Sequence, residues 1–384
     1  METEYFTFIL WEKARRKQTE ILNDIQSKFE ICKVFDITWP KSNFQKNLKR
    51  FYGITLVDPA EKERQCGNGP FLLLILADKK PKHGKRKTSL GSQIVNTNIY
   101  DNKMAYRKIL GSGFIVHSSI HKKESEHDFM LLLGKTILEI KSQFNSKWDG
   151  SIEKIKSDLF GNKWQTPKEI FQMLNSTINY VVLRNFEEMP NNLISEKHAD
   201  IDLLTDEQWQ IPYVLNMKKV SDVNVGFSPF VIIKNNKIKF DIKYVGDRYY
   251  DENWSRDMLR RRKLNKNGIF VPSEKDHFFS LLYHMIIHKR KLSDDYCEKL
   301  FSIAPDQVLK QHQKKDFTDF NKLNSILLEF MKENNYKFTD SLVYKLSHNE
   351  IVRIYNVSKF TLKHEGIGFL LRAIKSKVKR TIQE

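Results

Sequence analysis

The chain has 384 residues, 40% of them hydrophobic, so it is long enough to bury sizeable cores in two or three domains. It has no apolar run of the length that a membrane span needs, and its N-terminus lacks the basic and apolar regions of a signal peptide. With 65 Lys and Arg against 47 Asp and Glu, the net charge of +18 favours anionic partners such as nucleic acid, anionic lipid or phosphorylated substrates.

The first 141 residues alternate between strand and helix patterns. Apolar runs predict strands at 5–11, 31–39, 70–77 and 114–117, and periodic apolar residues predict helices at 19–29 and 43–52. This order is typical of an α+β layer with helices on one face of a sheet. We therefore expect a ferredoxin-like domain at 1–141, with the basic run Lys79 to Lys87 as a loop.

This N-terminal unit resembles the nucleoside diphosphate kinases. The order of elements agrees, as do Gly69-Pro70 before an apolar strand and the segment around His117-Ser118-Ser119 with Glu124-Ser125. In that family the histidine carries a phosphoryl group. Here Trp11-Glu12-Lys13 replaces the family's Lys-Pro-Asp after the first strand. The resemblance therefore implies the fold, and we interpret His117 as a surface residue in a simple turn.

The second half of the chain begins after a polar stretch with two glycines at 142–166, which we interpret as a linker. Thr166, Pro167 and Glu169 form a helix start, with Thr as N-cap, and predict a helix to about 177. Strands are predicted at 180–184, 200–204, 230–234 and 238–245, with a turn at Asn235-Asn236, and a helix at 273–291. The last part, 301–384, reads as helical.

Two acids two residues apart, Asp200 and Asp202, lie within one predicted strand, and Asp241 lies in a later one. Because alternate side chains of a strand share a face, Asp200 and Asp202 point the same way. Paired carboxylates are typical ligands of Mg²⁺, which keeps sites for substrate phosphates. The alternative is a solvated sheet edge.

The layout of a helix, a strand, Asp-x-Asp on a second strand and Asp on a later strand resembles the nucleotidyltransferase superfamily over about 167–300. The resemblance implies that Asp200, Asp202 and Asp241 bind Mg²⁺ on the phosphates of a donor, with Asp241 completing the site or acting as base. The family's glycine pair before the acids is replaced by Arg184-Asn185. Arg184 could bind phosphate in its place, or could be structural.

Three histidines, His277, His284 and His288, recur on one predicted helix. At 100° per residue they fall on one stripe. Three interpretations stay open: structural or partly exposed histidines, a face lining the active cleft, and a metal site with His-x₃-His spacing. Under the second interpretation, His284 and His288 join Arg184 and Asn185 as candidate donor-binding residues.

The basic C-terminal segment Arg372 to Arg380 carries apolar residues at helical spacing, which suits an anionic membrane surface. The whole chain also resembles bacterial surface-polysaccharide enzymes. That resemblance implies a glycan or glycan-lipid acceptor near the inner membrane. Three scattered cysteines, Cys32, Cys66 and Cys297, fit a reducing compartment, so we expect a cytoplasmic protein, peripheral at the inner membrane if the basic segment binds lipid.

The sequence therefore predicts an α+β protein with a ferredoxin-like domain, a nucleotidyltransferase-like α/β domain and a helical C-terminal region. Its expected function is Mg²⁺-dependent transfer of a nucleotidyl or phosphorylated sugar or polyol group from a nucleotide donor to a hydroxyl. Two alternatives stay open. One is an RNA- or tRNA-directed nucleotidyltransferase of toxin type, which the charge of +18 favours. The other is a catalytically inactive nucleotide-binding module, which the missing glycine pair favours.

Overall fold

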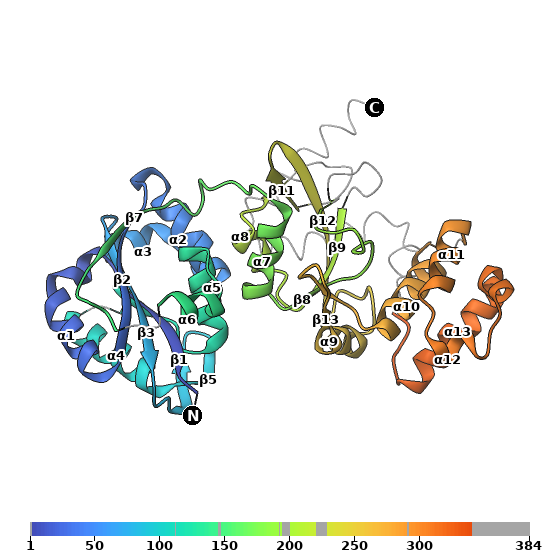
Figure 1. Cartoon of the computed structure of the whole chain (residues 1–384), viewed down its shortest axis with the longest axis horizontal. Helices are drawn as coiled ribbons and strands as arrows, with labels where there is room; N and C mark the ends of the chain where they lie inside the picture. The colour runs from blue at the N-terminus through green and yellow to red at the C-terminus, as the bar shows by residue number, and fades with distance from the viewer. Residues whose placement is uncertain are drawn as a thin grey trace, which may run out of the picture. The chain divides into compact units, whose positions relative to one another are not determined.

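The chain forms two compact units in the computed structural model, which describes residues 2–339 apart from 112, 145–146, 192, 194–199, 220–228 and 290–291. Unit 1 comprises Met1–Ile178 and Trp209–Met217, and unit 2 comprises Asn179–Gln208 and Lys218–Glu384 (Figure 1). The expected division at 1–141, 142–166, 167–300 and 301–384 stays a prediction. The expected basic C-terminal helix, around Arg372 to Arg380, falls outside the described residues.

Unit 1 is built on a five-stranded sheet with the order β6-β1-β3-β2-β7. Neighbouring strands are antiparallel except β2 and β7, which are parallel. The strands are β1 (Glu4–Leu10), β2 (Glu30–Thr38), β3 (Phe71–Asp78), β6 (Val116–Ser118) and β7 (Glu153–Lys156). The mixed α and β content is as expected, and the four expected strands correspond to β1, β2, β3 and β6. The ferredoxin-like assignment stays a prediction.

Helices cover both faces of this sheet: Figure 1 shows α1 and α4 on one side and α5 and α6 on the other. All eight residues of β3 are buried, as their continuous apolar run indicates for a strand covered on both faces. The helices are α1 (Gln18–Lys28), α2 (Phe44–Tyr52), α3 (Pro59–Cys66), α4 (Thr97–Leu110), α5 (Lys122–Leu133) and α6 (Ile137–Gln143), with short 3₁₀ helices at Glu12–Lys17, Lys41–Asn43 and Gly53–Thr55.

Two segments of unit 1 differ from expectation. The basic run at 79–87 is not a loop, because most of it belongs to a hairpin of β4 (His83–Thr88) and β5 (Gly91–Asn96). Its alternation is between exposed and half-exposed polar residues, so it leaves no apolar signal. The stretch 142–166 contains β7, which extends the sheet beside β2, so part of the expected linker belongs to the fold of unit 1.

Unit 1 also includes α7 (Pro167–Thr177) and the short α8 (Ile211–Val214). The Thr166 hydroxyl accepts a hydrogen bond of 3.3 Å from the Glu169 amide, so the expected N-cap is confirmed. Helix α7 contacts α5, and its residues Ile170, Phe171 and Leu174 are buried.

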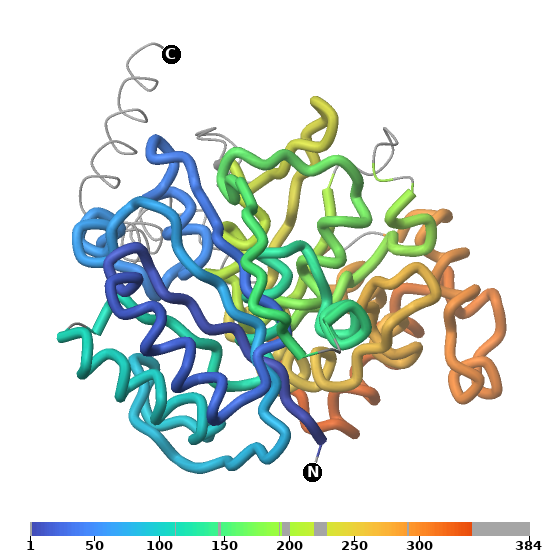
Figure 2. Tube along the Cα trace, turned by 60° about the vertical axis from the view of Figure 1, so that its left-hand side comes forward, coloured from blue at the N-terminus to red at the C-terminus, as the bar shows by residue number. Residues whose placement is uncertain are grey.

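Unit 2 is built on a second five-stranded sheet, with the order β10-β11-β12-β9-β8. Its strands are β8 (Tyr180–Val182), β9 (Asp200–Thr205), β10 (Lys218–Lys219), β11 (Pro229–Ile233) and β12 (Asn236–Tyr244). Strands β9 and β12 are parallel and the other pairs antiparallel. The β11–β12 turn falls at Lys234 and Asn235, both with positive φ, one residue earlier than expected; Figure 2 shows it at a protruding tip.

A helical layer packs on the sheet of unit 2 and shares one core with it. Val181 and Leu204 of the sheet belong to the same buried cluster as Trp254, Phe279 and Phe330 of the helices. The elements are α9 (Glu252–Arg261), α10 (Glu274–Tyr283), a π-helix (His284–Lys289), α11 (Asp294–Ser302), α12 (Asp306–Leu309), a 3₁₀ helix (Lys314–Thr318), α13 (Phe320–Glu333) and the small hairpin β13 (Lys263–Leu264) and β14 (Phe270–Val271). None of the helices in the described ranges combines the length and apolarity that crossing a bilayer requires.

Candidate functional site

The three acids singled out by the sequence lie on one face of two adjacent parallel strands in unit 2. The register pairs Asp202 of β9 with Asp241 of β12, and Asp200 with Lys239. Paired residues of parallel strands in register project to the same side, and alternate residues share a face. Asp200, Asp202 and Asp241 therefore share a face with two lysines, Lys239 and Lys243, while Ile201 and Phe240 point to the other face and are buried.

Each of the two inner carboxylates already has a cationic partner. The Arg184 guanidinium donates two hydrogen bonds to Asp202, of 2.9 Å from Nε to Oδ2 and 2.6 Å from Nη2 to Oδ1. Arg184 is 6% exposed and Asp202 8% exposed, so this is a buried bidentate ion pair. Lys243 Nζ donates to Asp241 Oδ1 at 2.8 Å. Asp200, at the start of β9, is exposed.

Burial governs the electrostatics of this pair. Burial raises the pKa of Asp202; Arg184 acts in the opposite direction, and the charges of Asp241 and Asp200 add to the rise. Burial by itself lowers the pKa of Arg184, but Tyr250, Tyr249 and Asp202 outweigh it, so the pKa is raised and the guanidinium stays charged. The charge of Asp202 therefore depends on its arginine.

A tyrosine and two histidines adjoin the ion pair. Tyr249 Oη and His284 Nδ1 share a hydrogen bond of 2.7 Å, and the Tyr249 ring stacks on His288 with centroids 3.9 Å apart. Lys243 Nζ lies 4.5 Å from the centre of the Tyr249 ring. Burial, with Arg184 next, lowers the pKa of His284 to about 2, so this histidine is neutral at physiological pH.

The sequence-predicted residues are only partly brought together. Arg184, His284 and His288 lie around Tyr249, but the Asn185 side chain points elsewhere and its Oδ1 accepts a hydrogen bond of 3.2 Å from Lys299 Nζ.

The expected single histidine stripe divides into two parts. The centre of the His277 ring is 4.7 Å from that of the Phe186 ring, while the ring centres of His284 and His288 are 6.1 Å apart. The physical reason is distance along the helix, because His277 precedes His284 by about two helical turns, roughly 10 Å, whereas His284 and His288 are about one turn apart.

The expected metal site can be tested against these contacts. Within the described ranges, no three carboxylate, histidine or cysteine side chains are grouped so as to hold a metal ion. Arg184 and Lys243 occupy the carboxylates of Asp202 and Asp241, leaving Asp200 as the exposed acid. As arranged, the residues do not fit a three-carboxylate Mg²⁺ site, and Mg²⁺ binding by Asp200, Asp202 and Asp241 stays a prediction.

Sequence reasoning missed Tyr249, Lys239 and Lys243 as members of this site. The two lysines had a signal, because they flank Asp241 at a spacing of two residues and must share its face. Tyr249 belongs to the run Gly246 to Asp251, which mixes aromatic and charged residues, but the sequence does not show which aromatic ring faces the acids.

In unit 1, His117 is not the surface turn residue that the sequence indicated. It lies in β6, is 8% exposed, and its Nε2 is 2.8 Å from Asp128 Oδ2. The same carboxylate oxygen accepts a 2.6 Å hydrogen bond from the Thr7 hydroxyl. Burial opposes ionisation of Asp128, but His117 and His127 outweigh it and lower the pKa of this carboxyl. These contacts hold His117 within a buried polar network.

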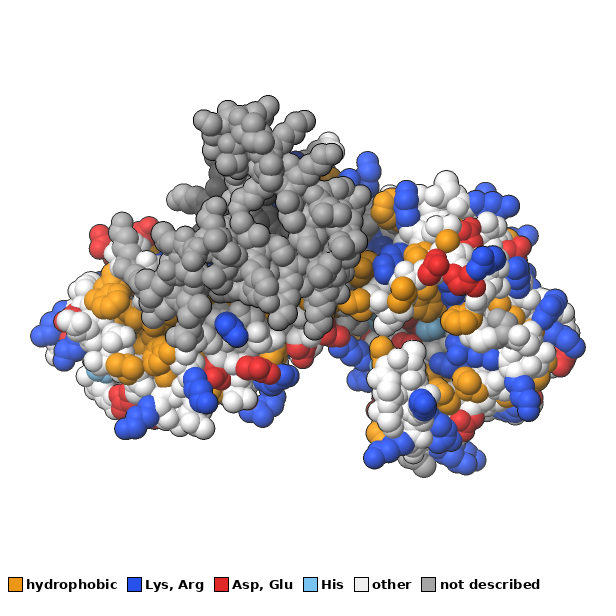
Figure 3. Space-filling model, turned by 180° about the vertical axis from the view of Figure 1, so that it is seen from behind, with side chains coloured by type: hydrophobic (Ala, Val, Ile, Leu, Met, Phe, Trp, Pro, Cys, Tyr) orange, Lys and Arg blue, Asp and Glu red, His pale blue; other side chains and the backbone are white. Residues whose placement is uncertain are grey.

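Basic side chains do not gather in one patch on the described part of the face drawn in Figure 3. They are spread among hydrophobic and acidic side chains. The basic side chains on the described part of that face therefore give no local indication of a nucleic-acid path.

Comparison with known proteins adds little. No protein-family model matches the sequence, and no curated protein matches it. A solved structure with a detectable likeness is the solution structure of the antibiotic-resistance factor ANT(2'')-Ia. It is 10% identical, the match covers 48% of this chain and 87% of that chain, and the TM-score is 0.21. A likeness at this level establishes neither a fold nor an activity for the chain.

Proposed function

We propose that unit 2 is a nucleotidyltransferase-like domain that binds a nucleotide or nucleotide-linked donor at the face of Asp200, Asp202 and Asp241, and transfers a nucleotidyl or phosphorylated sugar or polyol group to a hydroxyl acceptor. The observation that carries the proposal is the parallel register of β9 and β12, which pairs Asp202 with Asp241. Arg184 and Lys243 already offset the charges of Asp202 and Asp241, and the exposed Asp200 is the acid left open to a cation that a donor complex could bring.

The residues around the acids have definite roles in this proposal. Lys239 and Lys243 are suited to bind donor phosphates, since both lie on the same face as the acids. Tyr249 offers a ring for stacking, although that ring now stacks on His288. When bound, Mg²⁺ would neutralise negative charge on the transferred group. In the present arrangement Arg184 and Lys243 hold the carboxylates that the ion would need.

A second candidate function, a nucleotide-binding module without turnover, is favoured by one specific observation. Arg184 is a fixed cation on the carboxylate of Asp202, whereas metal-dependent transfer requires this carboxylate to be free. Under this candidate, Arg184 takes the electrostatic place of the metal and donor binding needs no divalent ion.

The acceptor and the setting are part of the proposal. A glycan or glycan-lipid acceptor, and hence a role in surface-polysaccharide synthesis in the cytoplasm or at the inner membrane, rests on the sequence resemblance. RNA is the competing acceptor and rests on the net charge. Binding to RNA that weakens steeply with added salt, without binding to glycan lipids, would favour RNA.

The deciding experiment is thermal unfolding with each nucleoside triphosphate and with CDP- and UDP-linked donors, with and without Mg²⁺. It compares the wild type, the Asp200→Asn/Asp202→Asn double variant, and Asp295→Asn as a control that removes an exposed acid of α11 in unit 2. A donor at ten times its dissociation constant adds about 1.4 kcal/mol of stability.

Each outcome has a distinct meaning. Stabilisation that needs Mg²⁺ and is lost only in the double variant supports the transferase. Stabilisation without Mg²⁺, together with no transfer of label from the donor, supports the binding module. If no donor stabilises the wild type, both candidates are wrong.

A further inference from the structure

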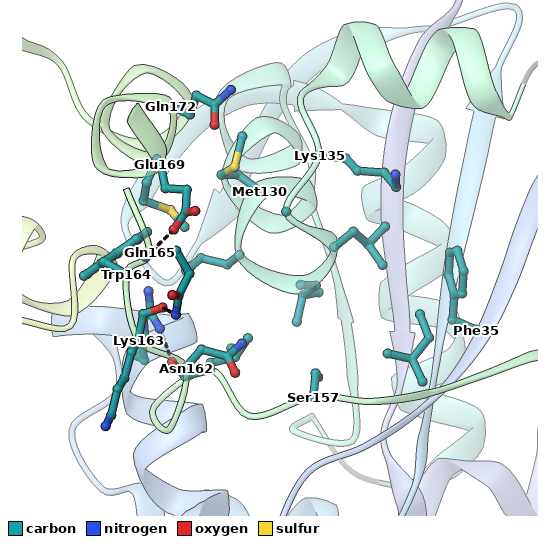
Figure 4. Close-up of a pocket in the computed structure, with 18 of the residues that line it drawn as sticks. Phe35, Met130, Lys135, Ser157, Asn162, Lys163, Trp164, Gln165, Glu169 and Gln172 are labelled. Carbon is teal, nitrogen blue, oxygen red and sulfur yellow. Dashed lines mark hydrogen bonds between the residues drawn. The ribbon is translucent and has the colours of Figure 1, made fainter. Parts of the chain in front are cut away.

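Unit 1 contains a cavity of about 730 Å³ that the proposed function does not use. It lies between the sheet, through Phe35 of β2 and Ile155 of β7, and helices α5 and α7, through Met130 and Met173 (Figure 4). Sites for small molecules in proteins have volumes of about 300–1,000 Å³ and are lined mainly by apolar groups with a few polar ones. The cavity has this size, and its lining is more polar than usual, with polar and apolar groups in about equal share.

The apolar part of the lining consists largely of buried side chains. Phe35, Met130 and Leu159 are buried, and Trp164 adds an aromatic ring. The Trp164 Nε1 donates a hydrogen bond of 2.8 Å to the Leu215 carbonyl, which fixes the orientation of the ring. The wall therefore offers a preformed surface to an aliphatic or planar ligand.

A buried arginine lines the same cavity. Arg50 of α2 is 7% exposed, and its guanidinium lies 5.4 Å from the centre of the Trp164 ring. Nη2 donates 3.1 Å to the Val214 carbonyl and Nη1 donates to the Leu159 carbonyl, while Nε has no partner in the described part of the chain. Burial lowers the pKa of Arg50 to about 10, so the group stays charged at neutral pH.

The other charged groups of the lining leave a positive surplus. Glu153 pairs with Lys33 at 3.1 Å, and Glu169 Oε2 accepts a 2.9 Å hydrogen bond from the Gln165 amide. By contrast, no ion pair is recorded between described residues for Arg50, Lys135 or Lys163, all of which line the cavity. Arg50 is the buried cation of this set; the charge of Asp158 raises its pKa but is outweighed by burial, and no carboxylate forms an ion pair with it in the described part of the chain. A buried cation that lacks a direct ion pair is costly, so an anion in this cavity would be stabilised.

We propose that this cavity is a binding site for a small organic anion, with its phosphate or carboxylate group directed to Arg50 and its apolar or aromatic body against Trp164 and the buried side chains of β2, α5 and α7. The site is independent of the acid face of unit 2, and the failure of either proposal leaves the other standing.

A purely structural role of Arg50 makes a different prediction. The two carbonyl contacts tie α2 to the segments at 159 and 214, and this tie alone would explain the burial. In that case removal of Arg50 changes stability but does not change a preference for anions over neutral molecules of the same shape.

The test uses two fluorescent probes of matched shape on the full chain. 8-Anilinonaphthalene-1-sulfonate carries an anionic group, and N-phenyl-1-naphthylamine has the same aromatic body without it. Both are titrated against the wild type, Arg50→Met, the cavity-filling variant Ile155→Trp, and the control Arg15→Met, which removes an arginine that pairs with Asp36 and does not line the cavity. Circular dichroism establishes that each variant is folded, and Ile155→Trp keeps the test valid if Arg50→Met does not fold.

The site predicts saturable binding of the sulfonate at least about tenfold tighter than of the neutral probe in the wild type and in Arg15→Met. That preference disappears in Arg50→Met, and both probes lose affinity in Ile155→Trp. Displacement of the sulfonate by nucleoside monophosphates identifies a phosphate ligand, and displacement by medium-chain or aromatic carboxylates identifies a carboxylate. Equal affinity for the two probes, unchanged binding in Ile155→Trp, or no displacement by either class at millimolar concentration overturns the proposal.

Discussion

Among the described residues, each unit has one buried arginine, and the two arginines have different kinds of partner. Arg184 of unit 2 forms a bidentate pair with Asp202, whereas Arg50 of unit 1 donates to two backbone carbonyls and has no carboxylate among the hydrogen-bond partners recorded for it. The pKa of Arg184 is raised, although its burial acts against this, and the pKa of Arg50 is lowered by burial. A buried cation that is paired with its own acid needs no further counter-charge. A buried cation beside a cavity can still bind an anion from solution.

The largest expected effect on stability comes from removing Arg184, the arginine that is paired with an acid. In Arg184→Met the Asp202 carboxylate stays buried without its cation, so the free energy of unfolding should fall by about 3–5 kcal/mol at pH 8. The pKa of Asp202 is already raised by burial and should rise further in the variant. A raised acid pKa costs stability above that pKa and ceases to cost as the pH falls through it, so the loss should be smaller at pH 5 than at pH 8.

Urea unfolding at both pH values measures this effect. The double variant Arg184→Met/Asp202→Leu is the control, since it removes both charges and should recover much of the loss. An equal loss at the two pH values would show that the arginine acts by packing and not by its charge.

Removing Arg50 should have a smaller effect and a flat pH profile. Arg50→Met leaves the Leu159 and Val214 carbonyls without a donor, which costs about 1–3 kcal/mol. Because no carboxylate is paired with Arg50, the loss should be the same at pH 5 and pH 8. The same urea series measures it, and a loss that shrinks at pH 5 would reveal an acid partner and remove the contrast with Arg184.

A buried histidine in unit 2 shows that burial can outweigh a nearby acid, because Glu187 raises the pKa of His277 but does not offset the effect of burial. Burial lowers the pKa of His277 to about 4. The unfolded chain then binds more protons than the folded one, so stability falls as the pH drops from about 7 towards 4, by about 2 kcal/mol at pH 5. His277→Phe should flatten this part of the pH–stability curve, and a curve of unchanged slope would locate the sensitivity elsewhere.

Local patterns were readable from the sequence, and long-range pairings were not. The start of α7 was predicted because Thr166, Pro167 and Glu169 carry the whole signal within four residues. The Arg184–Asp202 pair joins residues 18 apart, on segments whose pairing no local pattern specifies. Strand periodicity put Asp200 and Asp202 on one face, but only the register of β9 and β12 brings Asp241 beside Asp202.

The missed elements share a physical cause. Strand β4 consists of exposed and half-exposed polar residues, and β5 is buried at Val95 and Asn96 alone, so the hairpin lacks the apolar alternation by which strands are recognised. His117 was expected at the surface because a lone histidine beside serines is polar; its partner Asp128 lies eleven residues on and in a helix. Buried polar networks of this kind leave no mark in hydropathy, since their stability depends on mutual hydrogen bonds.

The smallest expected effect tests how far the ion pair of unit 2 extends. Tyr249→Phe keeps the ring that stacks on His288 but removes the hydroxyl that shares a hydrogen bond with His284, at a cost of about 1 kcal/mol. Tyr296→Phe is the matched control: the Tyr296 ring lies 6.3 Å from that of His284, and the change should stay within about 0.5 kcal/mol.

The informative quantity is the coupling between Tyr249→Phe and Arg184→Met in a double-mutant cycle. If Tyr249 and Arg184 belong to one electrostatic network, the double variant should depart from the sum of the single losses by at least about 0.5 kcal/mol. Strict additivity would confine the network to Arg184 and Asp202. Asp202 alone would then balance the charge of the buried Arg184. Tyr249, with His284 and His288, would be a separate group available to a ligand.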